Sequence, residues 1–204
     1  MARGFTPTGT RRAFHHGALP ADVIRAARTA LERDGAADLS LRGVAKATGV
    51  YPAAVSHHFG DREGLLAALA IDGFEQLIGA LEAATGPGTT APADGVRKML
   101  EAYLEFARRH PAVFAVMFSP WSMFERRHAA LEATGQRALA LLRDQVARWA
   151  ADAARADVDI ITESVWCTVH GLATMLIEER AGRRRKRFDV DAILGVALRP
   201  LGRG

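Results

Sequence analysis

A cysteine and a histidine in the last third of the chain have the spacing of a catalytic pair. Cys167 and His170 are three residues apart, so their side chains meet on a helix, where Glu163 can orient the imidazole. A thiolate beside a base is a nucleophile. Because the segment supplies no oxyanion hole, we expect no enzyme. A small helical enzyme or lipid-binding protein that uses Cys167 and His170 in an apolar pocket stays open as the alternative, as does redox activity of Cys167.

The histidine and cysteine content also argues against metal chemistry. The single cysteine excludes a disulfide within the chain and a zinc site built from cysteines, and it fits a reducing compartment. His57 and His58 are adjacent, and adjacent side chains on a helix point about 100° apart. The pair is therefore poorly placed to chelate one ion. We expect no metal and no cofactor.

The basic side chains are concentrated at the two ends of the sequence. The 204 residues include 27 Lys and Arg and 23 Asp and Glu, a formal charge of +4. Residues 1–60 contain 8 basic and 4 acidic side chains (+4), residues 61–178 contain 11 and 16 (−5), and residues 179–204 contain 8 and 3 (+5). This asymmetry favours an N-terminal unit that binds an anionic partner and a separate body that does not.

The hydrophobic pattern predicts a cytoplasmic protein with no membrane partner. No apolar run reaches the 18 or so residues of a membrane span. The first residues show no apolar run that precedes a cleavage pattern, so we expect no secretory signal. Hydrophobic residues at 49% and charged residues at 25% are typical of a globular domain.

Almost the whole sequence has helical periodicity, which predicts an all-α protein of about nine helices. Proline, glycine and capping residues mark their ends: Pro111 separates two helices, and Ser40, Asp61 and Asp157 are suited to cap others. The expected helices span residues 20–34, 41–48, 52–58, 61–84, 93–109, 111–118, 124–154, 158–181 and 189–199.

Two of the short helices, joined by Gly49 and Val50, predict a helix-turn-helix. Glycine tolerates the positive φ that such a turn requires. The apolar side chains that bury together would be Leu41, Val44, Ala45, Val55 and Phe59. The other faces of the second helix are then free to enter a major groove. Many short helix pairs bind nothing, so the spacing alone leaves DNA binding open.

Residues 40–66, SLRGVAKATGVYPAAVSHHFGDREGLL, resemble the DNA-binding domain of the tetracycline-repressor (TetR) family. The departures are Tyr51 and Pro52, which stand where Ser and a variable residue are commoner, and Ser56, which stands where the family often has Tyr. A Trp-x-x-x-His-Gly run that begins at Trp166 resembles one C-terminal subclass of the family. The matching positions are Ser40, Leu41, Val44, Ala45, Gly49, Val50, Val55, His58, Phe59, Glu63, Leu65 and Leu66.

The resemblance implies three regions: a flexible basic arm over residues 1–17, a helix-turn-helix DNA-binding domain over 18–64, and a ligand-binding and dimerisation domain over 65–204. Phosphate contacts are expected from Ser40, Arg42, His58 and Arg62. Base contacts are expected from Tyr51, Pro52, Ala53, Ser56 and His57, of which Pro52 and Ala53 suit a thymine methyl. Arg11 and Arg12 either reach a minor groove or form a solvated tail.

The body contains many aromatic and methionine side chains, which suit an adaptable apolar cavity or an ordinary core. The resemblance favours a cavity, because family members bind small effectors in this domain. His170 either contacts such an effector or satisfies a buried neighbour. The candidate ligand-binding residues are Tyr103, Phe106, Met117, Phe118, Trp121, Phe124, Trp166, Cys167 and His170.

The last two expected helices carry more apolar surface than one small helix can bury. The resemblance implies that they form a four-helix bundle with a second copy of the chain. The run Arg183–Arg187 between them is more typical of a solvated loop or salt-bridge partner than of a second DNA site. The candidate interface residues are Val165, Val169, Leu172, Leu176, Ile193, Leu194, Ala197 and Leu198.

The resulting hypothesis is a dimeric repressor bound to a near-palindromic double-stranded operator. An unknown small apolar or amphipathic effector would release it, with the helix at 61–84 transmitting the change. An activator or a ligand-independent regulator stays open within the same class.

Overall fold

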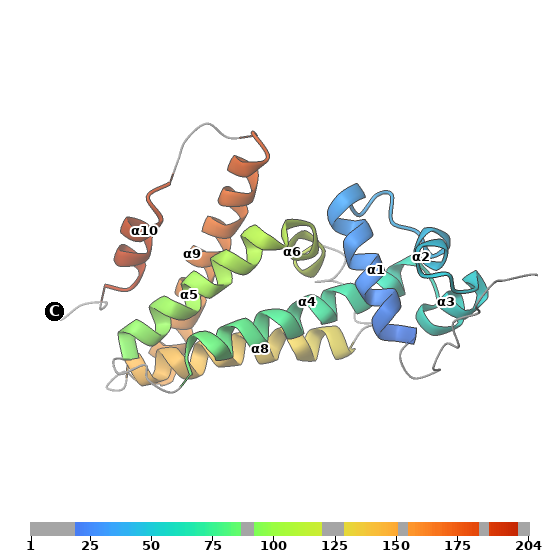
Figure 1. Ribbon diagram of the computed structural model, residues 1–204. Helices are drawn as coiled ribbons and strands as arrows, with labels where there is room; N and C mark the ends of the chain where they lie inside the picture. The colour runs from blue at the N-terminus through green and yellow to red at the C-terminus, as the bar shows by residue number, and fades with distance from the viewer. Residues whose placement is uncertain (1–18, 87–91, 120–128, 151–154, 184–187, 200–204) are drawn as a thin grey trace, which may run out of the picture.

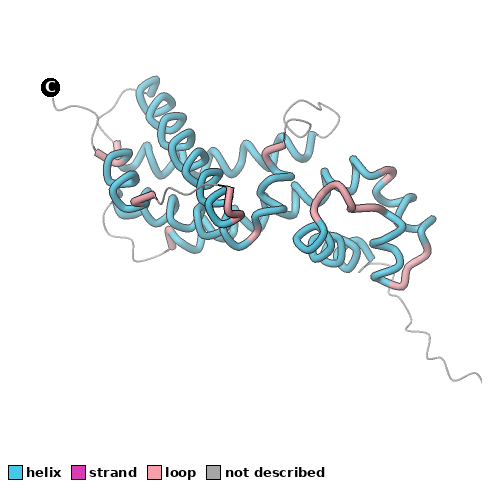
Figure 2. The backbone as a smooth tube through the Cα atoms, turned by 90° about the horizontal axis from the view of Figure 1, so that it is seen from above, coloured by secondary structure: helices cyan, strands magenta, loops and turns pink. Residues whose placement is uncertain are grey.

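The computed structural model describes residues 19–86, 92–119, 129–150, 155–183 and 188–199. These residues form nine α-helices, and no strand occurs among them (Figures 1 and 2). The bounds are α1 Leu19–Asp34, α2 Leu41–Thr48, α3 Pro52–Phe59, α4 Arg62–Ala84, α5 Pro92–Arg109, α6 Pro111–Met117, α8 Ala129–Trp149, α9 Arg155–Arg180 and α10 Val190–Ala197. The predicted all-α fold, with an N-terminal helix-turn-helix and a C-terminal helical domain, is confirmed.

Short-range capping defines the helix-turn-helix. The Ser40 hydroxyl accepts a hydrogen bond from the Gly43 N–H at 3.1 Å and caps α2, and the Asp61 carboxylate accepts from the Gly64 N–H at 2.9 Å and caps α4. Gly49 has φ 70°, a left-handed conformation that ends α2 and that other residues adopt at a cost. The turn between α2 and α3 is therefore encoded locally.

The N-terminal helices α1, α2 and α3 lie at one end of the molecule and share a small aliphatic core (Figure 1). Its buried side chains come from the inner faces of the three helices and, at Leu39, from the loop between α1 and α2. They are Val23, Ala27, Leu31, Leu39, Val44, Ala45 and Val55. Because this core is built from short side chains, the three helices pack closely and hold α3 at the outer edge.

Helix α4 connects this unit to the body. It packs against α1 at its N-terminal end and against α5, α6 and α8 over the rest of its length, with α9 and α10 beyond α5 (Figure 1). A Cβ added at Gly73 would lie 2.7 Å from both Met117 Sδ and Val113 Cγ1 of α6. A side chain at position 73 would therefore force Met117 and Val113 to shift, and glycine allows the observed approach of α4 and α6.

Two of the helices are long and apolar enough to cross a membrane, by length and composition alone: α4 and residues 157–180 of α9. Their burial differs, since 56% of the most apolar stretch of α4 is buried but only 28% of that of α9. The apolar composition of α4 is explained by its packing in the middle of the molecule. Helix α9 keeps an outward face with apolar side chains, including Ile160, which is 59% exposed.

Most of the predicted helix ends agree with the structure to within three residues. The prediction that Asp157 caps the helix in which it lies is wrong, because α9 begins at Arg155 and Asp157 falls in its first turn. The expected helix over 124–154 is observed as α8, and its two predicted ends lie outside the described residues.

Candidate functional site

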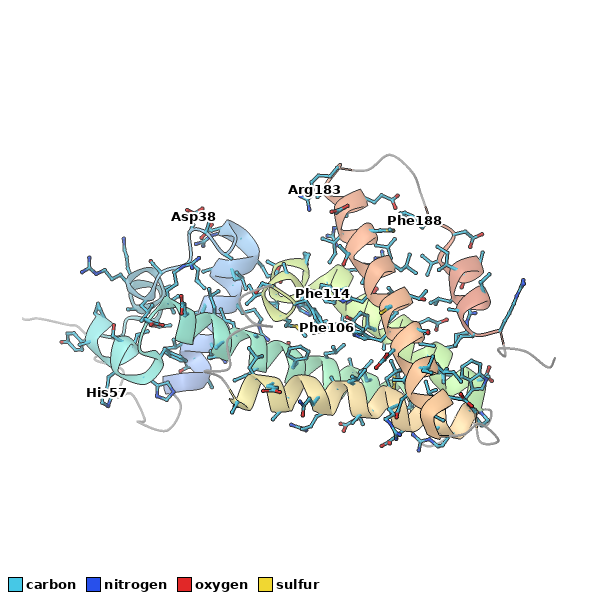
Figure 3. All side chains as sticks on the ribbon, turned by 180° about the vertical axis from the view of Figure 1, so that it is seen from behind. Asp38, His57, Phe106, Phe114, Arg183 and Phe188 are labelled. Carbon is cyan, nitrogen blue, oxygen red and sulfur yellow. The ribbon has the colours of Figure 1, made fainter. Side chains whose placement is uncertain are left out.

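Helix α3 presents a row of short polar and apolar side chains to the outside. Val55 is fully buried and Phe59 is half-buried against the core, with the ring of His58 4.7 Å from that of Phe59. Figure 3 shows the His57 side chain at the outer end of the molecule, far from Phe114 in the body. The exposed residues of this segment are Tyr51, Pro52, Ala53, Ser56, His57 and His58, the candidates for contact with bases and phosphates.

Tyr51 is the most prominent side chain of this surface. It is 84% exposed, the largest exposure of any large hydrophobic side chain in the described ranges. It occupies the N-cap of α3 without capping it through its side chain, and Pro52 follows in the first turn, where its missing N–H costs nothing. The ring is thus held at the tip of the helix with no role in the core.

Two cations border this surface. Arg42 and Lys46 are exposed on α2, and neither forms an ion pair with any described residue. Ser40, the other phosphate candidate on this side, is exposed and already bonded to the Gly43 N–H. The hydroxyl of Ser40 can still donate, so capping and phosphate contact are compatible.

Arg62 has a structural role that the sequence did not predict. Its Nε donates to the Leu39 carbonyl at 3.1 Å, and its Nη2 donates to the Ala36 carbonyl. The guanidinium therefore braces the loop between α1 and α2 from the start of α4. A contact between Arg62 and a phosphate stays a prediction, and it would have to use the donors left over from this loop.

The body contains a cluster of five rings centred on His170, which we call the aromatic cluster. The imidazole lies nearly parallel to the rings of Phe114 and Trp166, at 5.4 and 5.3 Å between centroids, and edge-on to Phe118 at 4.6 Å. Tyr103 is the fifth member. These rings come from α5, from α6 and its C-terminal cap, and from α9, so the cluster joins helices that are distant in sequence.

Two members of the aromatic cluster, Tyr103 and His170, are joined by a hydrogen bond. The Tyr103 hydroxyl is 2.9 Å from His170 Nδ1. Burial raises the pKa of the Tyr103 hydroxyl and lowers the pKa of the His170 imidazole. Both shifts favour the neutral forms, so the cluster is an aromatic site in which Tyr103 and His170 are uncharged.

Comparison with protein-family models divides the chain into the same N-terminal unit and C-terminal body. The model described as "Bacterial regulatory proteins, tetR family" matches residues 23–69, and the model described as "Tetracyclin repressor-like, C-terminal domain" matches residues 96–200, more than half of the chain. The chain belongs to the tetR family. None of the curated protein sequences matches it.

Solved structures show the same tetR-type fold. A protein of unknown function from a Rhodococcus species is 31% identical, with a TM-score of 0.76, over 92% of this chain and 95% of that one. The TetR family transcriptional regulator PfmR from Thermus thermophilus is 21% identical, with a TM-score of 0.63, over 89% and 99%. A tetR-family transcriptional regulator from Streptomyces coelicolor is 14% identical, with a TM-score of 0.70, over 91% and 79%.

The structure separates the predicted ligand-binding residues of this tetR-family regulator into two groups. Tyr103, Phe118, Trp166 and His170 meet in the aromatic cluster. The remaining described candidates lie elsewhere: Phe106 packs on the His110 ring at 5.2 Å, Met117 is buried beside Gly73, and Cys167 is exposed on α9. Trp121 and Phe124, like Arg11 and Arg12 of the arm, lie outside the described residues.

The position of Cys167 also bears on the nucleophile hypothesis. Its thiol is exposed, whereas His170 turns inward and its Nδ1 lies at hydrogen-bond distance from Tyr103. The expected Cys–His pair is therefore not formed. Glu163 is exposed and forms no hydrogen bond to His170.

Four predicted interface residues point into the protomer instead of toward a partner. Val165, Val169, Leu172 and Leu194 are 3% exposed or less. Their assignment to a surface between subunits is wrong, because the periodicity that identified an apolar face did not say which neighbour covers it. For α9 that neighbour is chiefly α5 of the same chain. The other four candidates are partly buried: Leu176, Ile193, Ala197 and Leu198.

Proposed function

We propose that the protein is a dimeric repressor that binds a near-palindromic operator through α3 and is released by a small apolar or amphipathic effector. The observation that carries the proposal is the outward row on α3, which is exposed and has no role in the core, between helices α2 and α4 that are capped by Ser40 and Asp61. Membership of a family of bacterial regulatory proteins supports the same role. Such a regulator works in the cytoplasm.

Recognition of the operator by α3 would rest on short side chains. The helix sequence PAAVSHHF contains no Arg, Lys, Asn or Gln, the residues that pair bidentately with guanine or adenine. Hydrogen bonds to bases would come from Tyr51, Ser56 and His57, and methyl contacts with thymine from Pro52 and Ala53. Arg42, with His58 and the helix N-termini, would fix the position on the phosphates.

A second copy of the chain would cover the outward face of α9. Ile160, Cys167 and Met175 are exposed on this helix, and Val196 on α10 is 61% exposed. A Cβ at Gly171, in the middle of this face, would meet nothing within 4 Å. An unfilled glycine in mid-helix costs about 1 kcal/mol relative to alanine. Close approach of a partner helix would give this glycine a purpose.

Effector binding is proposed at the aromatic cluster. Four of its members were predicted from the sequence, and its neutral Tyr103–His170 pair suits an uncharged hydrogen-bonding group on an otherwise apolar molecule. Helix α4, which packs against both α1 and α6, would carry the change to α3. Assignment to the subclass with the Trp-x-x-x-His-Gly motif belongs to the same proposal.

Selection of duplexes from a random-sequence pool tests operator binding. The purified protein should enrich a motif with two-fold symmetry whose half-sites are about one helical turn apart. A matched variant with Tyr51→Ala and His57→Ala should fold and enrich nothing. Enrichment of the same motif by both proteins, or of none by either, would contradict the proposal.

A further inference from the structure

A carboxylate from the DNA-binding unit caps a helix of the body. Glu32 lies near the end of α1, and its two oxygens accept hydrogen bonds from the first turn of α6. Oε2 accepts from the Ala112 N–H and Oε1 from the Val113 N–H, each at 3.2 Å. The partners are 80 and 81 residues apart in the sequence, so this contact is purely tertiary.

Within the described part of the chain, Glu32 supplies the acceptors for these two donors of the first turn of α6. The first N–H groups of a helix lack intrahelical acceptors. Here Pro111 has no N–H, the Phe114 N–H bonds to the His110 carbonyl at 2.8 Å, and the His110 side chain makes no capping bond. Glu32 therefore completes the N-terminus of α6, and its negative charge is favourable at that end of the helix dipole.

The same short helix contacts the aromatic cluster and α4. Phe114, in the middle of α6, and Phe118, at its C-terminal cap, both pack on His170. Val113 and Met117 lie against Gly73 of α4. Helix α6 thus touches α1, α4 and α9, and its two hydrogen bonds to α1 both end on the Glu32 carboxylate.

We propose that Glu32 is a positioning residue: through α6 it sets the orientation of the α1–α3 unit on the body and couples that orientation to the aromatic cluster. This inference rests on the proposed operator binding. A second link, the ion pair between Arg28 and Asp72 at 3.1 Å, attaches α1 to α4. Loss of Glu32 would therefore loosen the orientation without detaching the unit.

Three variants separate geometry from charge. Glu32→Gln keeps the length of the side chain and loses its charge, and Glu32→Asp keeps the charge and shortens the reach. Asp34→Asn is the matched control, because it removes a carboxylate from the same end of α1 that bonds to Arg33 and not to α6. A change in charge alone would tighten DNA binding in both Glu32→Gln and Asp34→Asn.

Affinity for a duplex selected by the wild-type protein is measured by fluorescence anisotropy, at a temperature where all variants are folded. We expect Glu32→Gln and Glu32→Asp to bind about tenfold more weakly than the wild type. Asp34→Asn should bind at least as tightly. Wild-type affinity in either Glu32 variant, even with a lowered melting temperature, would overturn the positioning role and leave Glu32 as a stabilising contact only.

A distance measurement without DNA keeps the two proposals distinguishable. Spin labels on Ala47→Cys in α2 and Lys98→Cys in α5, in a Cys167→Ser background, report the orientation of the unit. The distance distribution should broaden in both Glu32 variants and stay narrow in Asp34→Asn. Unchanged distributions would overturn the inference. Broadened distributions in a protein that selects no duplex would refute operator binding and leave the positioning role intact.

Discussion

The two regions of this regulator use polar groups in opposite ways. In the α1–α3 unit the core is aliphatic and small, and every side chain nominated for contact with bases is exposed. In the body the polar pair of Tyr103 and His170 packs among three further rings, and burial raises the pKa of Tyr103 and lowers the pKa of His170, so that both groups are neutral.

This difference suggests how each region would recognise a ligand. A duplex is large and charged, so an exposed surface can meet it with short side chains and bordering cations such as Arg42. A small apolar effector must be taken out of water, so its polar contact has to come from inside an apolar site. The following substitutions act on one region and spare the other.

The largest effect is expected at Tyr51. Replacement by alanine removes the most exposed aromatic ring of the α3 surface from both subunits of the proposed dimer, and operator affinity should fall by about 100-fold, since one good base contact contributes about 1–3 kcal/mol. The free energy of unfolding should not change, because the ring has no role in the core. Tyr51→Phe separates the hydroxyl from the ring. Anisotropy and urea denaturation measure the two quantities, and unchanged affinity in Tyr51→Ala would remove this residue from the site.

Overpacking between α4 and α6 ranks second. The added methyl of Gly73→Ala would meet Met117 and Val113 of α6 at 2.7 Å, so the free energy of unfolding should fall by about 1–3 kcal/mol. Gly79→Ala is the matched control on the same helix. Its Cβ meets nothing within 4 Å, and helix propensity should raise stability by about 0.5–1 kcal/mol. Equal effects in the two variants would show that α4 and α6 do not pack this closely.

The hydroxyl within the aromatic cluster should matter less. Tyr103→Phe removes the bond to His170 Nδ1 and leaves a partly buried nitrogen without its partner, which should cost about 1 kcal/mol of stability. The exposed hydroxyl of Tyr51 gives the comparison: Tyr51→Phe should cost nothing. Operator affinity without effector should be the same in Tyr103→Phe and the wild type. A loss of affinity would mean that the two regions are not separable in this way.

The proposed contacts of Pro52 and Ala53 with thymine methyl groups predict a smaller effect, which is tested by changing the DNA. Replacing a contacted thymine by uracil removes one methyl and leaves base pairing intact. Affinity should fall about fourfold for each methyl, the equivalent of about 0.8 kcal/mol. Ala53→Gly should abolish the difference between thymine and uracil at one position of each half-site. If no position of the selected duplex responds to uracil, Pro52 and Ala53 do not contact methyl groups.

The pH dependence of stability is the smallest expected effect. Because burial lowers the pKa of His170 in the folded state, the unfolded chain takes up this proton first as the pH falls below about 6.5. The His170 contribution to stability is therefore present at neutral pH and is lost on acidification. His170→Gln should show a shallower decline in the free energy of unfolding between about pH 7.5 and 5.5. Identical slopes in the wild type and in His170→Gln would contradict a neutral His170 imidazole in the folded protein.

How much could be predicted from the sequence depends on how far apart along the chain the interacting groups lie. The helix-turn-helix was predictable because Ser40, Gly49 and Asp61 act on backbone groups within a few residues of themselves. The bonds of Arg62 and Glu32 were not, because their acceptors and donors lie 23 to 81 residues away. No local pattern marks such partners.

The apolar side chains of α9 illustrate the same limit. Helical periodicity correctly identified Val165 and Val169 as members of an apolar stripe, but the stripe is covered by α5 of the same chain. The stretch is apolar on more than one face, so the pattern could not separate the inner face from the outer one. In the aromatic cluster, Tyr103 and Trp166 were found because large rings stand out in any sequence, but no local pattern predicted that Phe114 of α6 packs on His170 of α9.

The salt dependence of binding to a selected duplex tests the central claim most directly. If the α3 surface contacts bases while Arg42 and neighbouring groups contact phosphates, affinity should fall about a thousandfold between roughly 50 and 200 mM salt. A scrambled duplex should bind far more weakly at each salt concentration. A flat plot of affinity against salt, with equal affinity for both duplexes, would contradict sequence-specific DNA binding by this chain.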